Sequence, residues 1–251
     1  MKNYRITVQY DGTKYNGWQK QGNTPNTIQE KFEDVLSRMC SCSVEIFSSG
    51  RTDRGVHALN QTANFKCNTD KSALEIKDYL NQYLPQDIKV TNCVETDMRF
   101  HSRLSAVSKT YEYTIATEKP DVFMRKYVYY PYVTPDADKM EKASEKLLGT
   151  HDFAGFSSLG KTKKSTVRTI NSILVTKDEG IIKITINGNG FLYNMVRIIA
   201  GTLYEIGTGK KDESVIDTIF ETKSRENAGI TMPACGLKLV EVNYNEKQTK
   251  D

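Results

Sequence analysis

The order of strand-like and helix-like segments constrains the fold of this chain more than any other feature of its sequence. Apolar and polar residues alternate over 4–10 and 61–67, as expected for half-buried strands. Thr27 and Glu30 form a capping-box pattern before an apolar helical stripe, and a second helical stripe ends at Pro85. The expected elements are strand, helix, strand, strand, helix and strand, over 4–10, 27–39, 44–47, 61–67, 73–84 and 88–94. This β-α-β-β-α-β order predicts a ferredoxin-like unit.

The second part of the chain repeats this order with insertions. A helix capped by Thr134 and Pro135 is expected before two strands that pair across 178–180, and a long helix starts near Phe191. The expected elements lie over 111–115, 134–149, 169–176, 181–187, 191–206, 215–220 and 236–244, and an additional strand is considered over 127–132.

Two such units predict an α+β fold. We expect two ferredoxin-like β-α-β-β-α-β units joined into one broad, mainly antiparallel sheet, with helices on one face and a catalytic cleft between the halves. Residues 1–105 would form the N-terminal unit and carry the loop around Asp53. Residues 106–245 would form the C-terminal unit that completes the cleft, and 246–251 a polar tail.

Composition excludes several classes of protein. The formal net charge of +4 is compatible with a nucleic-acid partner if the cations cluster, but does not establish one. The five cysteines are irregularly spaced and form no CxxC pair, so we expect reduced thiols in a cytoplasmic protein and no metal site. Arg5, Gln9 and Asp11 interrupt any signal-peptide core, and the most apolar stretch, 191–206, is too short to cross a bilayer. No membrane partner is therefore expected.

The segment between the strands over 44–47 and 61–67 is rich in functional side chains. At its centre, the Asp53 carboxylate lies between Arg51 and Arg54 in sequence. A cation within about 4–6 Å lowers the pKa of a carboxylic acid by about 1–3 units. A carboxylate kept ionised in this way suits a nucleophile better than a general acid. On composition alone, a surface turn in which Asp53 bonds its own backbone is the simpler interpretation.

Four motifs carry a resemblance to a known family. Residues 50–58 read GRTDRGVHA, which resembles the GRTDxGVHA signature of the tRNA pseudouridine synthase A family. Further segments resemble that family in the same order: YDGT and GWQ at 10–13 and 17–19, FHSR and KTYEY at 100–103 and 109–113, and GFLYNMVR at 190–197. Two residues depart from the pattern. Arg54 stands where many members have a small residue, and Ser102 is a milder departure.

The resemblance implies a role for each candidate site residue. Asp53 would be the catalytic nucleophile, Tyr111 would stack on the target base, and Arg51 would support a flipped-out state of the RNA. The remaining candidate substrate-binding residues are His57, Arg103 and Arg54. From the residues alone, Tyr111 is most simply a strand aromatic, and His57 is equally well a residue that makes hydrogen bonds within the loop.

Arg197 lies in an apolar predicted helix. A charge in such a helix must either extend to water or find a partner, and extension to water is the commoner outcome. The resemblance implies instead that Arg197 pairs with the catalytic carboxylate. We therefore expect the Arg197 guanidinium within about 4 Å of the Asp53 carboxylate, the usual reach of an ion pair.

Two glycine patterns do not support nucleotide binding. The segment Gly188-Asn189-Gly190 would need a glycine at 193 to match a dinucleotide fingerprint, and Tyr193 stands there. Gly50 and Gly55 have phosphate-loop spacing but lack the Lys-Ser/Thr that should follow. Basic residues could instead form a track for a phosphate backbone: Lys14, Lys20, Arg99, Arg103, Lys109, Lys161, Lys163, Lys164 and Arg168.

The resemblance implies an isomerase that converts uridine to pseudouridine at positions 38, 39 and 40 of the tRNA anticodon stem-loop. In that chemistry the Asp attacks the ribose C1′ or, in the competing scheme, removes a ribose proton to give a glycal. No metal or small-molecule cofactor is needed, and the family implies a homodimer. Two other classes remain open: a non-catalytic RNA-binding module, and a nucleosidase, which would release free uracil.

Overall fold

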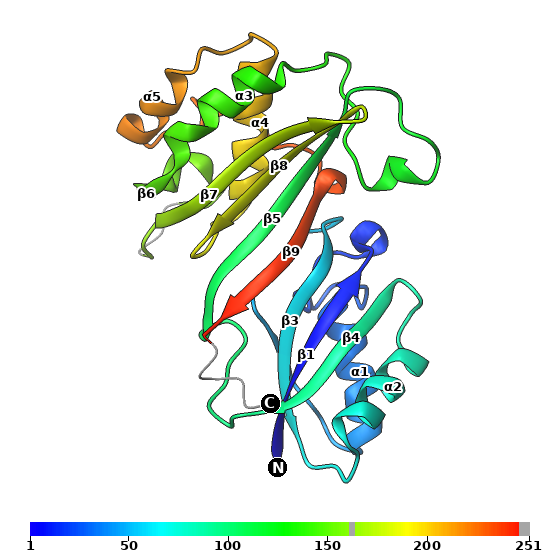
Figure 1. The fold of residues 1–251 in the computed structure, drawn as a ribbon. Coiled ribbons are helices and arrows are strands. Elements are labelled where there is room, and N and C mark those ends of the chain that lie inside the picture. The colour runs from blue at the N-terminus through cyan, green and yellow to red at the C-terminus, as the bar shows by residue number, and fades with distance from the viewer. Residues whose placement is uncertain (161–163, 246–251) are drawn as a thin grey trace. The chain divides into compact units, whose positions relative to one another are not determined.

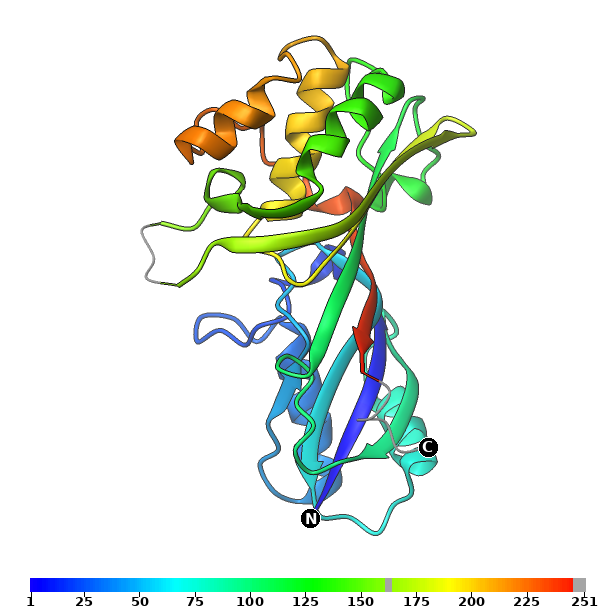
Figure 2. The same ribbon diagram turned by 60° about the vertical axis from the view of Figure 1, so that its left-hand side comes forward.

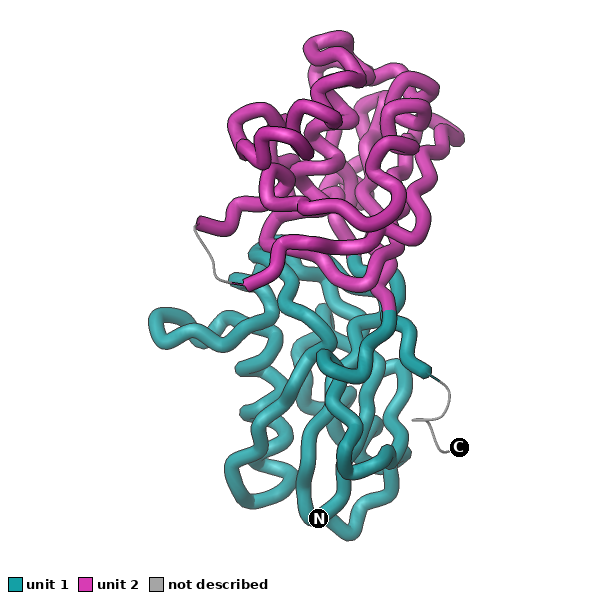
Figure 3. Tube along the Cα trace, turned by 90° about the vertical axis from the view of Figure 1, so that its left-hand side faces the viewer, with its two compact units in different colours: residues 1–107, 239–251 teal, residues 108–238 magenta. Residues whose placement is uncertain are grey.

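The computed structural model describes residues 1–160 and 164–245, so the predicted polar tail over 246–251 lies outside it. The chain divides into two compact units (Figure 3). Unit 1 comprises Met1–Val107 together with the chain from Leu239 onward, and unit 2 comprises Ser108–Lys238. The sequence prediction placed the last strand wholly in the second unit, and the structure assigns most of it to the first.

Unit 1 is built from helices packed on mainly antiparallel strands. Its elements are β1 (Lys2–Tyr10), η1 (Gly12–Lys14), α1 (Ile28–Cys40), β2 (Ile46–Ser48), β3 (His57–Cys67), α2 (Ala73–Tyr83), β4 (Ile88–Thr96) and most of β9 (Leu237–Tyr244). The strands follow the order β4-β1-β3-β9, and β2 pairs with β3 (Figure 1). β1 pairs antiparallel with both β3 and β4. The predicted β-α-β-β-α-β order is confirmed.

The elements of unit 1 begin and end where their sequences dictate. Alternate residues of β1 are buried, from Tyr4 to Tyr10, because one face of a strand covers the core. The hydroxyl of Thr27 accepts the N–H of Glu30 at the start of α1. A full capping box is present at α2 instead, between Ser72 and Glu75. α2 contacts both α1 and β4.

A buried polar network fixes the chain after β4. The Asn64 side-chain oxygen accepts bonds from the Ser102 N–H at 2.8 Å and the Ser102 hydroxyl at 2.5 Å. The Asn64 amide donates to Asn3 at 3.1 Å, and the Ser102 hydroxyl lies 2.9 Å from the carbonyl oxygen of Phe47. Because all three side chains are buried, each needs these partners. Ser102, which departs mildly from the family pattern, is thus a structural residue in unit 1.

Unit 2 has the same α+β character. Its elements are most of β5 (Ala106–Ala116), then η2 (Met124–Lys126), α3 (Ala137–Ser144), η3 (Glu145–Leu147), β6 (Gly149–Asp152), η4 (Phe153–Phe156), β7 (Val167–Asp178), β8 (Ile181–Gly188), α4 (Met195–Gly207), α5 (Val215–Thr222) and η5 (Ala234–Gly236). The strand order is β5-β8-β7-β6, with antiparallel neighbours. Figure 2 shows α3, α4 and α5 together on one side of β7 and β8. The α+β class and the mainly antiparallel pairing are confirmed.

Three local predictions in unit 2 were wrong. Residues 127–132 form no strand. Within this range, Tyr129 makes an isolated β-bridge to Ile115, and its neighbours do not extend the pairing. The cap of α3 is Asp136, whose carboxylate accepts the N–H groups of residues 138 and 139, rather than Thr134 and Pro135. α4 begins at Met195 rather than near Phe191, because Asn194 is in the left-handed region at φ 61°. β6 was not predicted.

Within residues 1–160 and 164–245, every helix is too short or too polar to span a bilayer.

We expect Asn64→Ala to lower the free energy of unfolding of unit 1 by about 2–3 kcal/mol, because buried Ser102 and Asn3 would lose their partner. Asn60→Ala is the matched control on the same strand. Asn60 is exposed, its amide bonds the Val240 carbonyl at 2.9 Å, and its loss should cost under about 1 kcal/mol. Hydrogen exchange of β1 and β3 amides measures both. Equal losses of unfolding free energy for Asn64→Ala and Asn60→Ala would show that the buried network stabilises unit 1 no more than a surface hydrogen bond does.

Candidate active site

The loop that contains Asp53 joins β2 to β3. This segment, residues 49–56, is called the Asp53 loop. At its start, the Ser49 N–H donates to the Thr62 carbonyl at 2.7 Å, and the Ser49 hydroxyl lies 2.5 Å from the Gln61 side-chain oxygen. The Gln61 amide donates to the Gly50 carbonyl at 2.9 Å. Because Ser49 and Gln61 are both buried, β3 holds this end of the loop firmly.

A second loop, residues 11–18, holds the other end and is called the first loop. The Trp18 N–H donates to the Thr52 carbonyl at 3.0 Å, and the Gly55 N–H donates to the Tyr15 carbonyl at 3.3 Å. Inside the Asp53 loop, the Val56 N–H donates to the Asp53 carbonyl at 3.1 Å and closes a turn. The YDGT and GWQ motifs therefore fold against the GRTDRGVHA motif.

Two glycines allow the loops to approach so closely. A Cβ on Gly12 would overlap the carbonyl oxygen of Val56. Gly17 has φ +89°, and a Cβ there would lie 2.6 Å from the Thr52 carbonyl oxygen. Any other residue at Gly17 would be strained in this left-handed conformation. Both positions therefore require glycine.

His57 is buried at the start of β3, and its ring faces the first loop. Nδ1 lies 3.1 Å from the Gly12 nitrogen and 3.2 Å from an Asp11 carboxylate oxygen. A single ring nitrogen cannot both accept from Gly12 and donate to Asp11. The Asp11 carboxylate already accepts the N–H of Thr13 at 2.9 Å and its hydroxyl at 2.5 Å. The geometry therefore favours a neutral ring that accepts from Gly12 and carries its proton on Nε2.

Thr52 and Tyr10 connect the Asp53 loop to β1. Their hydroxyl oxygens are 2.8 Å apart, and both residues are buried. Burial raises the pKa of Tyr10 to about 12, so the phenol stays protonated at neutral pH.

The charged residues of the Asp53 loop differ in exposure. Asp53 is half-buried, whereas Arg51 and Arg54 are exposed. Arg103 is also exposed, and its backbone N–H donates to His101 Nδ1 at 3.1 Å. In the Asp53 loop, exposed arginines therefore flank a half-buried carboxylate in the sequence, and exposed cations are groups that an anionic polymer can approach.

The two candidate residues of unit 2 have well-defined partners. Tyr111 is buried on β5, and its ring packs edge-on against Phe191 with centroids 5.1 Å apart. Arg197 is half-buried near the start of α4. Its Nε donates to the Met232 carbonyl at 2.7 Å, and a terminal nitrogen donates to the Asn194 side-chain oxygen at 2.9 Å. These bonds fix the guanidinium at the N-terminal end of the helix.

The candidate residues are thus divided between the units. Asp53, Arg51, Arg54, His57 and Arg103 lie in unit 1, and four of these five belong to or directly follow one loop. Tyr111 and Arg197 lie in unit 2. The contact between the Asp53 carboxylate and the Arg197 guanidinium stays a prediction.

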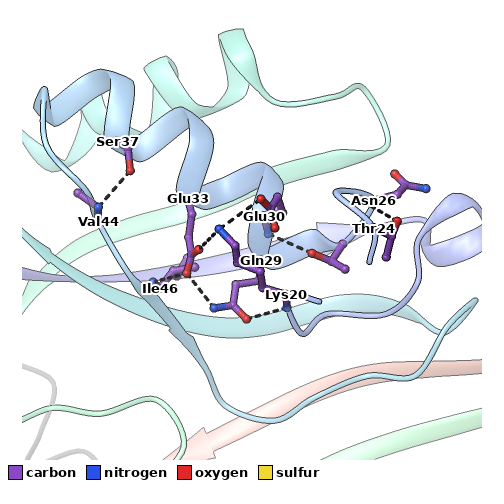
Figure 4. Close-up of polar contacts among 10 residues, drawn as sticks. Lys20, Thr24, Asn26, Gln29, Glu30, Glu33, Ser37, Val44 and Ile46 are labelled. Atoms are coloured by element: carbon purple, nitrogen blue, oxygen red, sulfur yellow. Dashed lines mark hydrogen bonds and ion pairs between the residues drawn. The ribbon is translucent and has the colours of Figure 1, made fainter. Parts of the chain in front are cut away.

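Two of the proposed phosphate-binding cations have partners within the protein. Lys20 lies 3.2 Å from Glu30 and 3.4 Å from Glu33 (Figure 4). Arg168 donates to the Ser165 carbonyl at 3.0 Å, and burial lowers its pKa. Lys161 and Lys163 lie outside the described residues. The predicted basic track is therefore weaker at Lys20 and Arg168 than the sequence suggests.

The residues that hold the Asp53 loop were not among the predicted site residues. Gly12 and Gly17 belong to motifs that carried the resemblance, so the sequence marked these positions but did not indicate that they let the two loops meet. Tyr15 and Gln61 gave no signal of their own, because their contribution is a backbone carbonyl and a buried amide. Among the described residues, no group of three or more His, Cys, Asp or Glu could hold a metal ion.

Comparisons with known proteins agree with this arrangement of motifs. The sequence matches the family described as tRNA pseudouridine synthase over residues 6–103 and 143–245. A Bacillus sp. (strain KSM-64) protein named tRNA pseudouridine synthase A is 47% identical over 245 residues, covering 97% of this chain and 100% of that protein. Proteins of Bacillus cereus and Clostridium kluyveri, named tRNA pseudouridine synthase A 2 and tRNA pseudouridine synthase A, are 44% and 43% identical over the same shares.

Similarity to solved structures is weaker. An H/ACA RNP bound to a substrate RNA containing 2'-deoxyuridine matches with a TM-score of 0.41 and 9% identity, over 94% of this chain and 47% of that chain. A likeness at this level carries no conclusion.

The chain belongs to the tRNA pseudouridine synthase family. It is an isomerase that converts uridine to pseudouridine in tRNA.

We expect Gly12→Ala to reduce pseudouridine formation by about 100-fold, because the added Cβ displaces Val56 and with it the Asp53 loop. Gly22→Ala is the control, since a Cβ at Gly22 meets nothing within 4 Å. Rates with unmodified tRNA and thermal unfolding curves are compared for both variants. A Gly12→Ala rate equal to that of Gly22→Ala would disprove the proposed packing constraint.

Proposed function

We propose that this isomerase acts on uridines 38, 39 and 40 in the anticodon stem-loop of tRNA, with Asp53 as its nucleophile. The observation that carries the proposal is the anchoring of the Asp53 loop at both ends. β3 bonds residues 49 and 50, and the first loop bonds residues 52 and 55. A carboxylate on a loop held in this way keeps one position while it stays half-exposed to substrate.

The chemistry needs an ionised carboxylate within reach of the ribose. In one route, an Asp53 oxygen attacks C1′, and the C1′–N1 bond breaks with its electron pair leaving on uracil. The uracil then rotates, C5 bonds to C1′ and displaces the carboxylate, the C5 proton is lost, and N1 gains a proton. In the other route, Asp53 removes a ribose proton and uracil leaves to give a glycal. Both routes begin from the same ionised group, so the proposal for Asp53 does not depend on the choice between them.

The other site residues would assist this step. We propose that Arg197 pairs with Asp53 and keeps it ionised, since a nearby cation favours the charged form of an acid. Tyr111 would stack on the target base. Arg51 would support the flipped-out state, because a base inside a stem must leave its stack at a cost of roughly a few kcal/mol.

Two exposed arginines, Arg54 and Arg103, would contact phosphates of the RNA. His57 would contribute to substrate binding by holding Gly12, and through it the first loop, in place. We further propose that the enzyme works as a homodimer in the cytoplasm, as the family resemblance implies. Sedimentation of the purified protein tests the first of these, and fractionation of cells the second.

We expect Asp53→Asn to abolish pseudouridine at positions 38–40 and to leave tRNA affinity within a few-fold, because the amide keeps the shape but is no nucleophile. The measurement maps pseudouridine at nucleotide resolution in unmodified tRNA incubated with each protein. Retention of roughly a tenth of the wild-type rate would remove Asp53 from this role. Modification at other uridines would refute the anticodon assignment, and release of free uracil would indicate a nucleosidase.

We expect Arg197→Met to reduce the rate by about 100-fold or more and Arg197→Lys to restore only part of it, because lysine lacks the planar fork. Both variants alter the bonds to Met232 and Asn194 and could therefore lower stability as well as activity. Thermal unfolding curves measure the change in stability separately. An Arg197→Met rate within twofold of wild type would refute the proposed pairing with Asp53.

A further inference from the structure

The first loop is itself tied to a residue that belongs to neither active-site loop. Asp87 lies in the turn between α2 and β4, distant in sequence from Asp53. Its carbonyl accepts the Asp11 N–H at 3.0 Å, and its carboxylate accepts the Tyr15 hydroxyl at 2.5 Å. The other carboxylate oxygen is 3.9 Å from the Lys14 ammonium, which is mostly exposed and adds little. Asp87 therefore contacts both ends of η1.

Tyr15 connects Asp87 to the Asp53 loop. Its hydroxyl donates to Asp87, while its backbone carbonyl accepts the Gly55 N–H at 3.3 Å. Gly55 lies inside the turn that the Val56 N–H closes on the Asp53 carbonyl. A continuous series of hydrogen bonds therefore runs from the Asp87 carboxylate through Tyr15 to the turn at Asp53.

The bond between Tyr15 and Asp87 is of a strong type. Tyr15 is 4% exposed, and a hydrogen bond from a hydroxyl to an ionised carboxylate is about twice as strong as one between neutral groups. Burial raises the pKa of Tyr15, and the Asp87 carboxylate raises it further. The phenol thus remains a donor across the neutral range of pH. Since Tyr15 lies on a loop with little regular structure, this bond adds a side-chain restraint to the backbone bonds that Tyr15 makes with Gly12 and Gly55.

We propose that Asp87 is a positioning residue for the isomerisation, which acts through Tyr15 to hold the Asp53 loop in its reactive conformation. The inference rests on the proposed role of Asp53. Apart from the weak pair with the exposed Lys14, the contacts of Asp87 go to Asp11 and Tyr15 of the first loop, so its loss should slow chemistry and change tRNA binding little.

The test compares Tyr15→Phe, Asp87→Ala, Asp87→Asn and the Tyr15→Phe/Asp87→Ala double variant. Single-turnover rates are measured with enzyme in excess over unmodified tRNA, and tRNA affinity is measured separately. We expect Tyr15→Phe and Asp87→Ala each to lower the rate constant by about 10-fold and to change affinity by less than about twofold. Asp87→Asn retains an acceptor oxygen and should recover part of the rate. The double variant should be no slower than the slower single variant, because both remove one bond.

The matched control is Tyr204→Phe in unit 2. The Tyr204 hydroxyl donates to the Val133 carbonyl at 3.2 Å, and Tyr204 is also buried. Its loss should affect stability alone and leave the single-turnover rate constant unchanged. A merely structural role for Asp87 would make Asp87→Ala behave in the same way, with a lower unfolding temperature and an unchanged rate constant for the folded protein.

The outcomes separate this inference from the proposed function. Rate constants within twofold of wild type for Tyr15→Phe and Asp87→Ala, or effects that multiply in the double variant, would overturn the positioning role. If Asp87→Ala does not fold, Tyr15→Phe removes a single oxygen atom and still decides the question. Asp53→Asn is included in the series. If it stays active, the proposed function fails, whereas an inactive Asp53→Asn beside fully active Tyr15 and Asp87 variants refutes only the inference.

Discussion

The backbone hydrogen bonds between the first loop and the Asp53 loop are the contacts on which the candidate site of unit 1 depends. Trp18 donates to Thr52, and Gly55 donates to Tyr15. Neither loop has regular secondary structure beyond η1, so its backbone N–H and C=O groups need partners from elsewhere. Each loop supplies some of these hydrogen-bond partners to the other. Because these bonds join backbones, they need side chains small enough to let the loops meet. Gly12 and Gly17 meet that need.

The candidate charged residues of the two units differ in exposure and in how they are held. In unit 1, the cations near Asp53 are exposed and so are available to phosphate groups, while the carboxylate is half-buried. In unit 2, Arg197 lies in a mostly apolar helix, where an unsatisfied charge would be costly. The Met232 carbonyl and the Asn194 side-chain oxygen accept from two of its N–H donors and orient the guanidinium. Because Arg197 has these acceptors within the protein, its side chain does not have to extend to water. The helical pattern alone, which favours extension to water, does not reveal these partners.

The sequence predicts the regular elements well and the contacts between loops poorly. Alternation over 4–10 and the stripe behind Thr27 identify β1 and α1, because burial of one face determines both patterns. The start of α4 was misplaced because Asn194 is left-handed and its side chain bonds Arg197 and Ser158, which ends the extended chain before the helix. The Asp53 loop was found only through its motif. Nothing local in the sequence indicates that residue 87 bonds residue 15, because that contact exists only after β1 and β4 have paired.

The motifs of unit 1 therefore separate into two physical kinds. Arg51 and Arg54 are exposed and Asp53 is half-buried, so all three keep part of their surface accessible, as groups that contact a substrate must. Gly12, Thr52 and His57 are buried, and their contacts join the two loops to each other and to β1 and β3. A substitution of the first kind alters charge at the loop surface, so Arg54 in place of a small residue adds a positive charge there. A substitution of the second kind would move the Asp53 carboxylate itself. For the proposed reaction, which depends on the position of that carboxylate, the buried residues are therefore as restrictive as Asp53.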